Sequence, residues 1–202
     1  AKTLSEIDDI YRPFRPKRKT RASMAKEKGL APLAEEILAQ HRKSPEPLVL
    51  ALAYIDEEKG VQTAEEALQG AMDIIAEQAS DDAALRKSLR EIMMAEGQLV
   101  SKGTTEESSV YSMYYDFSQS VKGIAPHRVL AVNRGEREGY LKVSIETDEA
   151  RSQRILTKTY VRNNHSLCCE TVKNAVLDGY SRLIFPALER EIRNELTDQA
   201  SE

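Results

Sequence analysis

The sequence predicts a mainly α-helical protein: a multi-helix scaffold with a helix-turn-helix-like module, a minor β element and a long C-terminal helix. Composition is the first reason, because aromatic residues make up only 5% of the 202 residues, charged residues make up 31%, and tryptophan is absent. Apolar residues at helical spacing and clear helix-capping patterns are the second and third reasons. A hydrophobic content of 41% is enough to form a buried core.

Short helices are predicted in the first third of the chain. Thr20 can cap a helix that Gly29 closes. Pro32 suits the first turn of a helix that runs toward about His41. The apolar run over residues 48–55 is too short to span a membrane and predicts a buried helix, with a strand as the alternative.

Two longer helices follow. Thr63-Ala-Glu-Glu66 is a capping box, in which the Thr63 side chain accepts from the Glu66 amide and the Glu66 carboxylate reaches back to the Thr63 amide. Ser80 begins a second capping pattern. Short helices joined by tight turns predict a helix-turn-helix-like module over residues 31–103, with a possible short strand at 98–101.

The middle of the chain mixes helical and strand signals. Apolar and aromatic residues recur at helical spacing over 110–117, which predicts a helix. Residues 140–146 alternate apolar and polar side chains and form the best strand pattern of the chain. Residues 126–139 could form a hairpin with that strand or a helix from Pro126, and a proline in the first turn favours the helix.

A long helix is predicted from about residue 166 to the end. Gly179 and Pro186 are its weak points, and Pro186 should kink it by removing a hydrogen bond and crowding the carbonyl four residues earlier. The last residues still follow a helical pattern, so we expect the chain to be a fragment of a longer protein. The predicted parts are 1–30, a basic extended segment with short helices; 31–103, the helix-turn-helix-like module; 104–165, a helical and short-strand segment; and 166–202, the truncated start of a long helix.

The sequence offers no recognisable catalytic centre. His165 and the adjacent Cys168 and Cys169 give at most three local ligands where a structural metal site needs four. There is no phosphate-binding glycine loop and no nucleophile or kinase motif. We therefore predict that the protein is not an enzyme and has no catalytic residues, metal or cofactor.

Cellular location follows from similar observations. Adjacent cysteines in a helical pattern point away from each other, so a disulfide between them is not expected. The sequence lacks a secretory pattern and an apolar run of about 18 residues, the length a membrane span needs. These features predict a cytoplasmic protein with no membrane partner.

Positive charge is concentrated near the N-terminus. Six basic side chains and no acid fall within residues 11–21, although the chain has a formal net charge of −4. Two prolines predict an extended segment, which Tyr11 and Phe14 could anchor. Such a ribbon can present its cations to phosphates. The candidate nucleic-acid contacts are Arg12, Arg15, Lys17, Arg18, Lys19 and Arg21.

Four stretches span nearly the whole chain: Asp9-Ile-Tyr-Arg-Pro-Phe-Arg-Pro-Lys-Arg-Lys-Thr-Arg-Ala22, Glu65 to Glu77, His127 to Val143 and Asp178 to Leu196. In order and spacing they resemble the Tex family, bacterial transcription accessory proteins related to a eukaryotic elongation factor. The resemblance implies a longer protein, in which this region precedes an RNase H-like domain, a helix-hairpin-helix segment and an oligonucleotide-binding barrel. It also implies nucleic-acid binding and a role in transcription, with the principal RNA-binding surface on the barrel.

Two functions from different classes are compatible with these patterns. The first is a nucleic-acid-associated fragment of a transcription accessory protein, which contacts RNA or DNA backbones without sequence specificity. The alternative is a structural scaffold that positions nucleic-acid-binding domains and docks on the transcription machinery. The helix at 64–79 carries four acids and no base, so we interpret the helix-turn-helix as architecture. RNA versus DNA preference and oligomeric state stay open.

Overall fold

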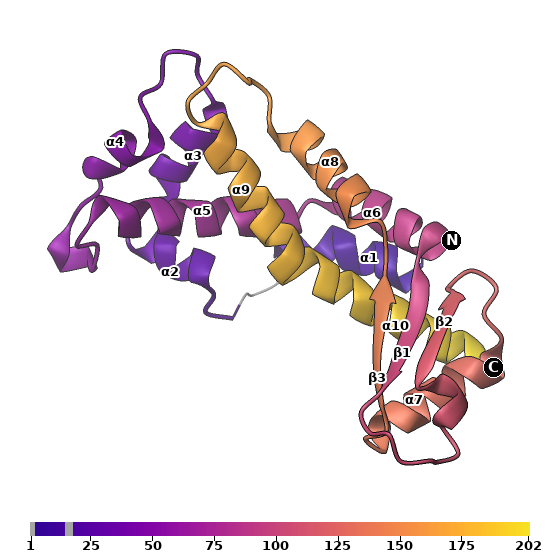
Figure 1. The fold of residues 1–202 in the computed structure, drawn as a ribbon. Coiled ribbons are helices and arrows are strands. Elements are labelled where there is room, and N and C mark those ends of the chain that lie inside the picture. The colour runs from indigo at the N-terminus through magenta and orange to yellow at the C-terminus, as the bar shows by residue number, and fades with distance from the viewer. Residues whose placement is uncertain (1–2, 15–17) are drawn as a thin grey trace. The chain divides into compact units, whose positions relative to one another are not determined.

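The computed structural model describes residues 3–14 and 18–202. They form two compact units, and each is built from separate parts of the chain. Unit 1 comprises residues 1–86 and 150–185, and unit 2 comprises 87–149 and 186–202. Helices dominate and strands occur only in one small sheet among the described residues (Figure 1), so the predicted fold class is confirmed.

Unit 1 is helical and is organised around α5, Ala64–Ser80. Helices α2, α3, α4 and α9 all pack against α5, whose buried face consists largely of alanine and isoleucine. Small side chains allow this close approach of several helices to one. The other elements are α1 (Leu4–Tyr11), η1 (Arg12–Phe14), α2 (Arg21–Glu27), α3 (Ala31–Ala39), α4 (Pro47–Leu52), η2 (Glu57–Lys59), the start of α6 (Ala83–Glu96), α8 (Glu149–Tyr160), α9 (Cys169–Gly179) and the π-helical η4 (Tyr180–Ile184).

Local hydrogen bonds explain where the first helices begin. Thr3 and Glu6 form a reciprocal capping box at the start of α1, with N···O distances of 3.0 and 3.2 Å. Thr20 caps α2 as predicted, because its Oγ1 accepts from the Ser23 amide at 3.1 Å. Gly29 follows α2 with φ +78°, a left-handed conformation that glycine adopts without strain.

The caps of the two longer helices differ in part from the prediction. Thr63 Oγ1 accepts from the Glu66 amide at 3.2 Å as expected, but the Glu66 carboxylate accepts from the Gln62 amide, at 2.8 Å, instead of the Thr63 amide. Ser80 does not cap the next helix. Asp82 does, because its Oδ1 accepts from the Leu85 amide at 3.0 Å. A carboxylate two residues later therefore takes the role that the pattern assigned to a hydroxyl.

Helix α4 contradicts the prediction of a buried helix at 48–55. It spans Pro47–Leu52, and its buried residues are Pro47 and Ala51. Leu48, Val49 and Leu52 are exposed. Because α4 has only six residues and contacts α5 through its small side chains, its large apolar side chains face outward.

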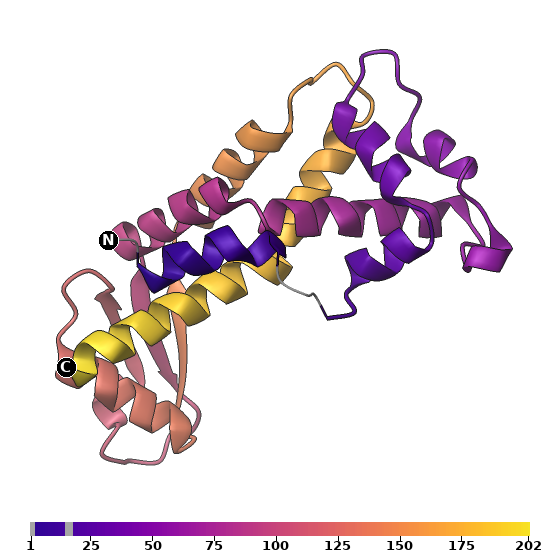
Figure 2. The same cartoon turned by 180° about the vertical axis from the view of Figure 1, so that it is seen from behind.

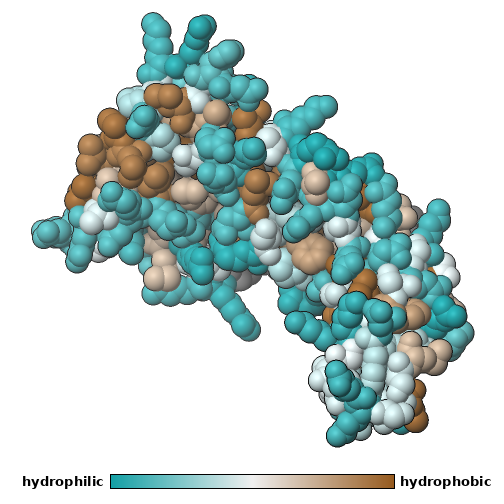
Figure 3. Space-filling view, in the orientation of Figure 1, coloured by the Kyte–Doolittle hydropathy of each residue, from teal (hydrophilic) through white to brown (hydrophobic). Residues whose placement is uncertain are grey.

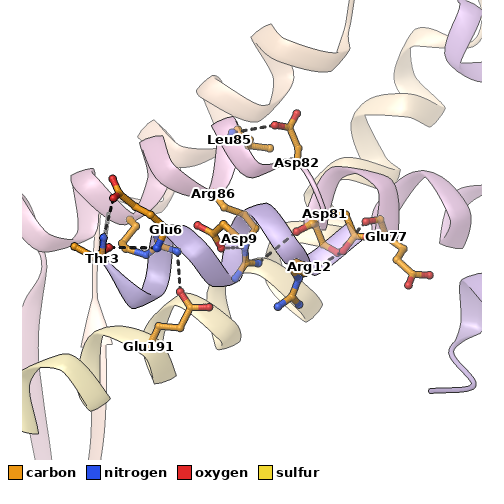
Figure 4. Close-up of polar contacts among 12 residues, drawn as sticks. Thr3, Glu6, Asp9, Arg12, Glu77, Asp81, Asp82, Leu85, Arg86 and Glu191 are labelled. Carbon is orange, nitrogen blue, oxygen red and sulfur yellow. Dashed lines mark hydrogen bonds and ion pairs between the residues drawn. The ribbon is translucent and has the colours of Figure 1, made fainter. Parts of the chain in front are cut away.

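A buried ion pair joins α1 to the start of α6. Arg86 Nε lies 3.0 Å from Asp9 Oδ1, and the exposed fractions of the two side chains are 0% and 4%. The Arg86 guanidinium also donates to the carbonyl of Ser80 at the end of α5, at 3.4 Å. One buried arginine thus fixes three elements of unit 1 (Figure 4).

Gln40 connects the end of α3 to the segment after α8. It is buried and has φ 49°, an unusual left-handed value for a residue other than glycine. Its Nε2 donates to the Tyr160 carbonyl at 2.8 Å and its Oε1 accepts from the Arg162 amide at 3.0 Å. The Asn163 side chain donates to the Gln40 carbonyl at 3.1 Å. These bonds satisfy the Tyr160 carbonyl at the end of α8, the Arg162 amide that follows α8 and the Gln40 carbonyl at the end of α3.

Unit 2 contains a three-stranded antiparallel sheet in the order β2-β1-β3. The strands are β1 (Gln98–Gly103), β2 (Asp116–Ser120) and β3 (Leu141–Glu146), with Leu99 opposite both Gln119 and Ile145. Helix α7, Pro126–Arg137, packs against β3. Helix α10, Phe185–Ser201, lies behind the strands in Figure 1 and in front of them in Figure 2. Two strand predictions, at 98–101 and 140–146, and the helix from Pro126 are confirmed.

The predicted helix at 110–117 is wrong. The segment contains a short 3-10 helix, η3 (Ser112–Tyr114), and the start of β2. Antiparallel pairing with β1 determines the conformation here, and Tyr114 is buried while Val110 and Met113 are exposed. The local spacing of apolar and aromatic residues resembles that of a helix, because a local pattern carries no information about pairing with a distant strand.

The long C-terminal helix is confirmed as α9, η4 and α10, which follow one another from Cys169 to Ser201. The irregular part of this long helix is the π-helical η4, which ends two residues before Pro186. Proline has no N–H to donate to the carbonyl of Arg182 four residues earlier, so the regular α-helical hydrogen-bond pattern is interrupted next to η4. Cys168 and Cys169 are both free, as expected.

Candidate nucleic-acid interface

The basic stretch belongs to unit 1 and is less extended than predicted. Helix α1 continues through Tyr11, and residues 12–14 form η1, so the stretch is helical from residue 11 to residue 14. The structure describes Arg18 and Lys19 outside any helix and places Arg21 at the first position of α2. Arg15 and Lys17 lie outside the described residues. Helix α1 ends at Tyr11, before Pro13, and Pro13 itself lies within the short η1, so this proline does not make residues 12–14 extended.

Arg12 is engaged within the protein. Its Nε lies 3.5 Å from Asp81 Oδ1, and 28% of its side chain is exposed. Figure 4 shows Arg12 beside Asp81 at the end of α5, close to the buried pair of Asp9 and Arg86. We expect Arg12 to contribute less to phosphate binding than a cation without such a carboxylate, because Asp81 already offsets its charge.

Arg18, Lys19 and Arg21 are exposed. Across residues 3–14 and 18–202, no ion pair is formed by any of these three side chains. They are therefore three adjacent cations whose charge faces solvent, the arrangement that a phosphate-binding segment needs.

Arg18 and Arg21 also line a pocket of about 430 Å³ in unit 1. Arg12 and Arg182 line the same pocket, together with the acidic Asp73, Glu77 and Asp81. The remaining lining residues are Thr20, Ala22, Ser80 and Leu183. Four arginines and three acids give the pocket wall almost balanced charge. The pocket is therefore a poor closed anion site. Arg18 and Arg21 share its wall with these acids, whereas Lys19 does not line it.

Hydrogen bonds and ion pairs within unit 1 account for much of the charge balance of the pocket wall. Thr20 Oγ1 donates to Glu77 Oε2 at 3.2 Å. Arg182 Nη2 lies 3.1 Å from Asp178 Oδ2 and 3.9 Å from Asp73 Oδ1. Sequence reasoning missed Arg182, because only the packing of α9 and η4 against α5 brings it to the pocket. No local motif around residue 182 signals this position.

Tyr11 and Phe14 do not anchor the stretch. Their exposed fractions are 62% and 82%, so both rings face solvent in unit 1. Exposed aromatic rings next to cations are typical of surfaces on which single-stranded bases stack. The expected anchoring role is wrong, and the rings are available for contact with a ligand.

Two arginines of unit 2, Arg134 and Arg128, are held by their own neighbours. Arg134 Nε lies 3.0 Å from Glu138 Oε1, and the hydroxyl of Tyr111 donates to Glu138 Oε2 at 2.7 Å. The hydrogen bond from Tyr111, and after it the one from Arg134, lowers the pKa of the Glu138 carboxyl group. Arg128 donates to Gln119 at 2.6 Å and lies 5.8 Å from the centre of the Phe117 ring. Such partners make this part of unit 2 the weaker candidate for phosphate contact.

The described residues contain neither a helix long and apolar enough to cross a membrane nor a group of three potential metal ligands. Comparison with known proteins gives a match to a protein family. A family model described as Tex central region-like matches residues 42–202. The chain belongs to the Tex family.

Individual Tex relatives extend the likeness over the basic stretch. This Tex-family chain is 44% identical to the uncharacterized protein YdcI of Bacillus subtilis over 203 residues, which covers 98% of the chain and 28% of YdcI. It is 37% identical to protein tex of Bordetella pertussis, over 73% of the chain and 19% of that protein. It is 32% identical to transcriptional accessory protein Tex of Neisseria gonorrhoeae, over 99% of the chain and 27% of that protein. The chain therefore spans less than a third of the length of these relatives.

Proposed function

We propose that this Tex-family chain is a nucleic-acid-associated part of a transcription accessory protein, and that it acts by binding and not by catalysis. The observation that carries the proposal is the run of exposed cations, Arg18, Lys19 and Arg21, beside the exposed rings of Tyr11 and Phe14. Cations contact phosphates and rings stack on bases, so the combination suits single-stranded nucleic acid. Membership of a family with a relative named as a transcriptional accessory protein supports the same function.

Binding of this kind is independent of base sequence. Phosphate contacts position a nucleic acid without reading bases, and the acidic residues of α5 make that helix unsuited to a DNA groove. We place the contacts on Arg18, Lys19 and Arg21 first. Arg15 and Lys17 stay in the proposal from the sequence alone, and Arg12 ranks last because it pairs with Asp81.

A scaffold function is the second candidate, and the ion pair between Arg12 and Asp81 favours it. In that case the basic stretch would serve mainly to attach α1 and η1 to the end of α5. The two candidates differ in what the exposed cations at residues 18–21 do.

The deciding experiment is fluorescence anisotropy of labelled single-stranded RNA and duplex DNA over a salt series. The variant R18Q/K19Q/R21Q removes the three exposed cations. We expect weaker binding of single strands and a salt slope, in log affinity against log salt, smaller by up to about 2, because each phosphate contact on a single strand contributes about 0.7.

The control variant R42Q/K43Q/K158Q removes the same charge from three other exposed positions of unit 1. It should bind almost as the unchanged protein does. Equal losses in both variants would indicate a nonspecific effect of net charge and would contradict the proposed site. No binding by the unchanged protein at about 50 mM salt, where phosphate contacts are strong, would leave the scaffold function.

A further inference from the structure

An exposed apolar surface lies on α4 of unit 1 and on the residues that follow this helix. It consists of Leu48, Val49, Leu52 and Ile55, with exposed fractions of 42%, 52%, 57% and 41%, and we call it the α4 patch. Figure 3 shows it as a continuous hydrophobic area over α4, bordered by hydrophilic residues. Single exposed apolar residues are ordinary on protein surfaces, whereas a cluster with a polar border marks an interaction site.

The orientation of α4 strengthens this interpretation. The side chains that α4 buries are Pro47 and Ala51, and those that it exposes include two leucines and a valine. A helix selected only for the stability of unit 1 would be expected to place its larger apolar side chains inward, since burial of each stabilises the fold. The outward position of Leu48, Val49 and Leu52 therefore points to a surface that another molecule covers.

The charge around the patch indicates what kind of molecule this is. Residues 44–58 contain four acids, Glu46, Asp56, Glu57 and Glu58, and no lysine or arginine. The cations that adjoin this range in sequence are the exposed Arg42 and Lys43 before it and Lys59 after it. Lys59 is directed toward the turn after α2, because its Nζ lies 3.2 Å from the position that a Cβ on Gly29 would occupy. The range that contains the patch itself therefore carries only acidic charge.

More acid lies on the helix that supports α4. Glu65 and Glu66 are exposed in the first turn of α5, against which α4 packs. An apolar surface with an acidic border repels phosphates, so a nucleic acid is a poor occupant. A surface with apolar residues at its centre and basic residues at its edge is complementary to it.

We propose that the α4 patch binds a segment of a partner protein that is apolar on one face and basic on the other. The apolar face covers Val49 and Leu52, and the basic residues meet the carboxylates at positions 46 and 56–58. Helix-in-groove recognition uses the same division between apolar anchors and charged borders. This inference goes beyond the proposed function, because it concerns a protein partner and none of the cations at residues 18–21.

The test uses two synthetic amphipathic helices of about 15 residues, a length at which helices become stable enough to study. One carries Leu and Lys, and the other carries the same Leu positions with Glu in place of every Lys. Fluorescence anisotropy of each labelled peptide with the full chain should show binding of the Lys peptide only, weakened by added salt. Equal binding of both peptides would overturn the proposed charge complementarity.

Two variants of the patch test its parts separately. V49Q/L52Q should weaken binding of the Lys peptide about tenfold or more, since central apolar anchors dominate such interfaces. E57Q/E58Q should weaken it less and reduce its salt dependence. The matched controls are V110Q/M113Q and E106Q/E107Q, which change exposed residues of the same kinds in unit 2. Circular dichroism melting checks that every variant folds.

Besides equal binding of the two peptides, three results would overturn the proposal. Unchanged peptide affinity in V49Q/L52Q would show that the patch is not the binding surface. Loss of RNA binding in V49Q/L52Q would make the patch a nucleic-acid surface. Sedimentation showing a dimer that V49Q/L52Q converts to a monomer would make a second copy of the chain the occupant.

Discussion

The Arg86 side chain is a buried cation, and its ion pair with Asp9 makes this burial possible. The two side chains are 0% and 4% exposed, and Arg86 Nε lies 3.0 Å from Asp9 Oδ1. Removing two charges from water costs several kcal/mol each, so a pair of this kind adds little net stability over an apolar pair. We expect its effect to be on specificity, because an arrangement that buried Arg86 away from Asp9 would leave a buried charge without this partner.

This balance predicts different results for single and double substitutions. Arg86→Met leaves the Asp9 carboxylate buried without its cation and should reduce the free energy of unfolding by about 3–5 kcal/mol. The double variant D9L/R86M removes both charges and should recover most of that loss. Urea denaturation followed by circular dichroism measures both.

An exposed ion pair gives the control. Lys102 and Asp116 are 2.8 Å apart with side chains 62% and 89% exposed, so Lys102→Met should change stability little. A double variant as unstable as Arg86→Met alone would show that the guanidinium matters through contacts other than the Asp9 carboxylate.

Among the elements, α5 and α9 depend on a glycine at their crossing. A Cβ at Gly179 would lie 2.7 Å from the carbonyl oxygen of Ala76 and 3.1 Å from its Cα. Those are backbone atoms of α5 and cannot move without shifting the helix. The sequence marks Gly179 as a weak point of a long helix, whereas its role in the structure is close packing.

Gly179→Ala should therefore destabilise unit 1 even though alanine is the better helix former by about 1 kcal/mol. We expect a net loss of about 1 kcal/mol or more, since overpacking a tight contact costs about 1–3 kcal/mol. Gly70→Ala is the comparison, because the three atoms nearest to its new Cβ all belong to the side chains of Leu30 and Ala25. Thermal melting would contradict the argument if Gly179→Ala were the more stable of the two.

Elements governed by local chemistry were predictable, and elements governed by distant partners were not. Thr20 and Gly29 flank the two ends of α2, and Pro126 begins α7, as the local preferences of these residues indicate. Residues 110–117 show helical spacing but form part of a sheet, because β1 supplies backbone partners that no local pattern reveals. The orientation of α4 was missed for the same reason, since only its contact with α5 decides which side is buried.

For the whole molecule, the discontinuity of each unit matters most. Unit 1 is formed by residues 1–86 together with residues 150–185. Helix α9 covers α5, and the hydroxyl of Tyr160 donates to Asp82 at 3.0 Å. The module predicted over 31–103 stays a prediction, and separate expression of parts of unit 1 can test how the chain divides.

Residues 1–86 alone should show no cooperative thermal transition, because the face of α5 that α9 covers would be open to water. Adding a peptide of residues 150–185 should restore a cooperative transition in circular dichroism. A scrambled peptide of the same composition is the control. A sharp transition for residues 1–86 without any addition would show that the N-terminal helices fold independently.

The candidate site shows the same division between what a sequence reveals and what packing adds. The cluster of cations at Arg18, Lys19 and Arg21 was visible because charge within one stretch can be counted directly. The contact of Arg12 with Asp81 and the position of Arg182 were not, because each joins segments distant in sequence. Patterns near a residue therefore identified candidate contacts, and the fold decided which of them remain available.

Gln40 carries a consequence for the evolution of the chain. Its side chain must donate to one backbone group and accept from another, at Tyr160 and Arg162. Glutamate would lose the donor and lysine the acceptor, so neither can replace it without loss. The residues tolerated at position 40 are therefore dictated by a loop 120 positions away. Among relatives, we expect replacements at position 40 to be inherited together with changes in length or path of that loop.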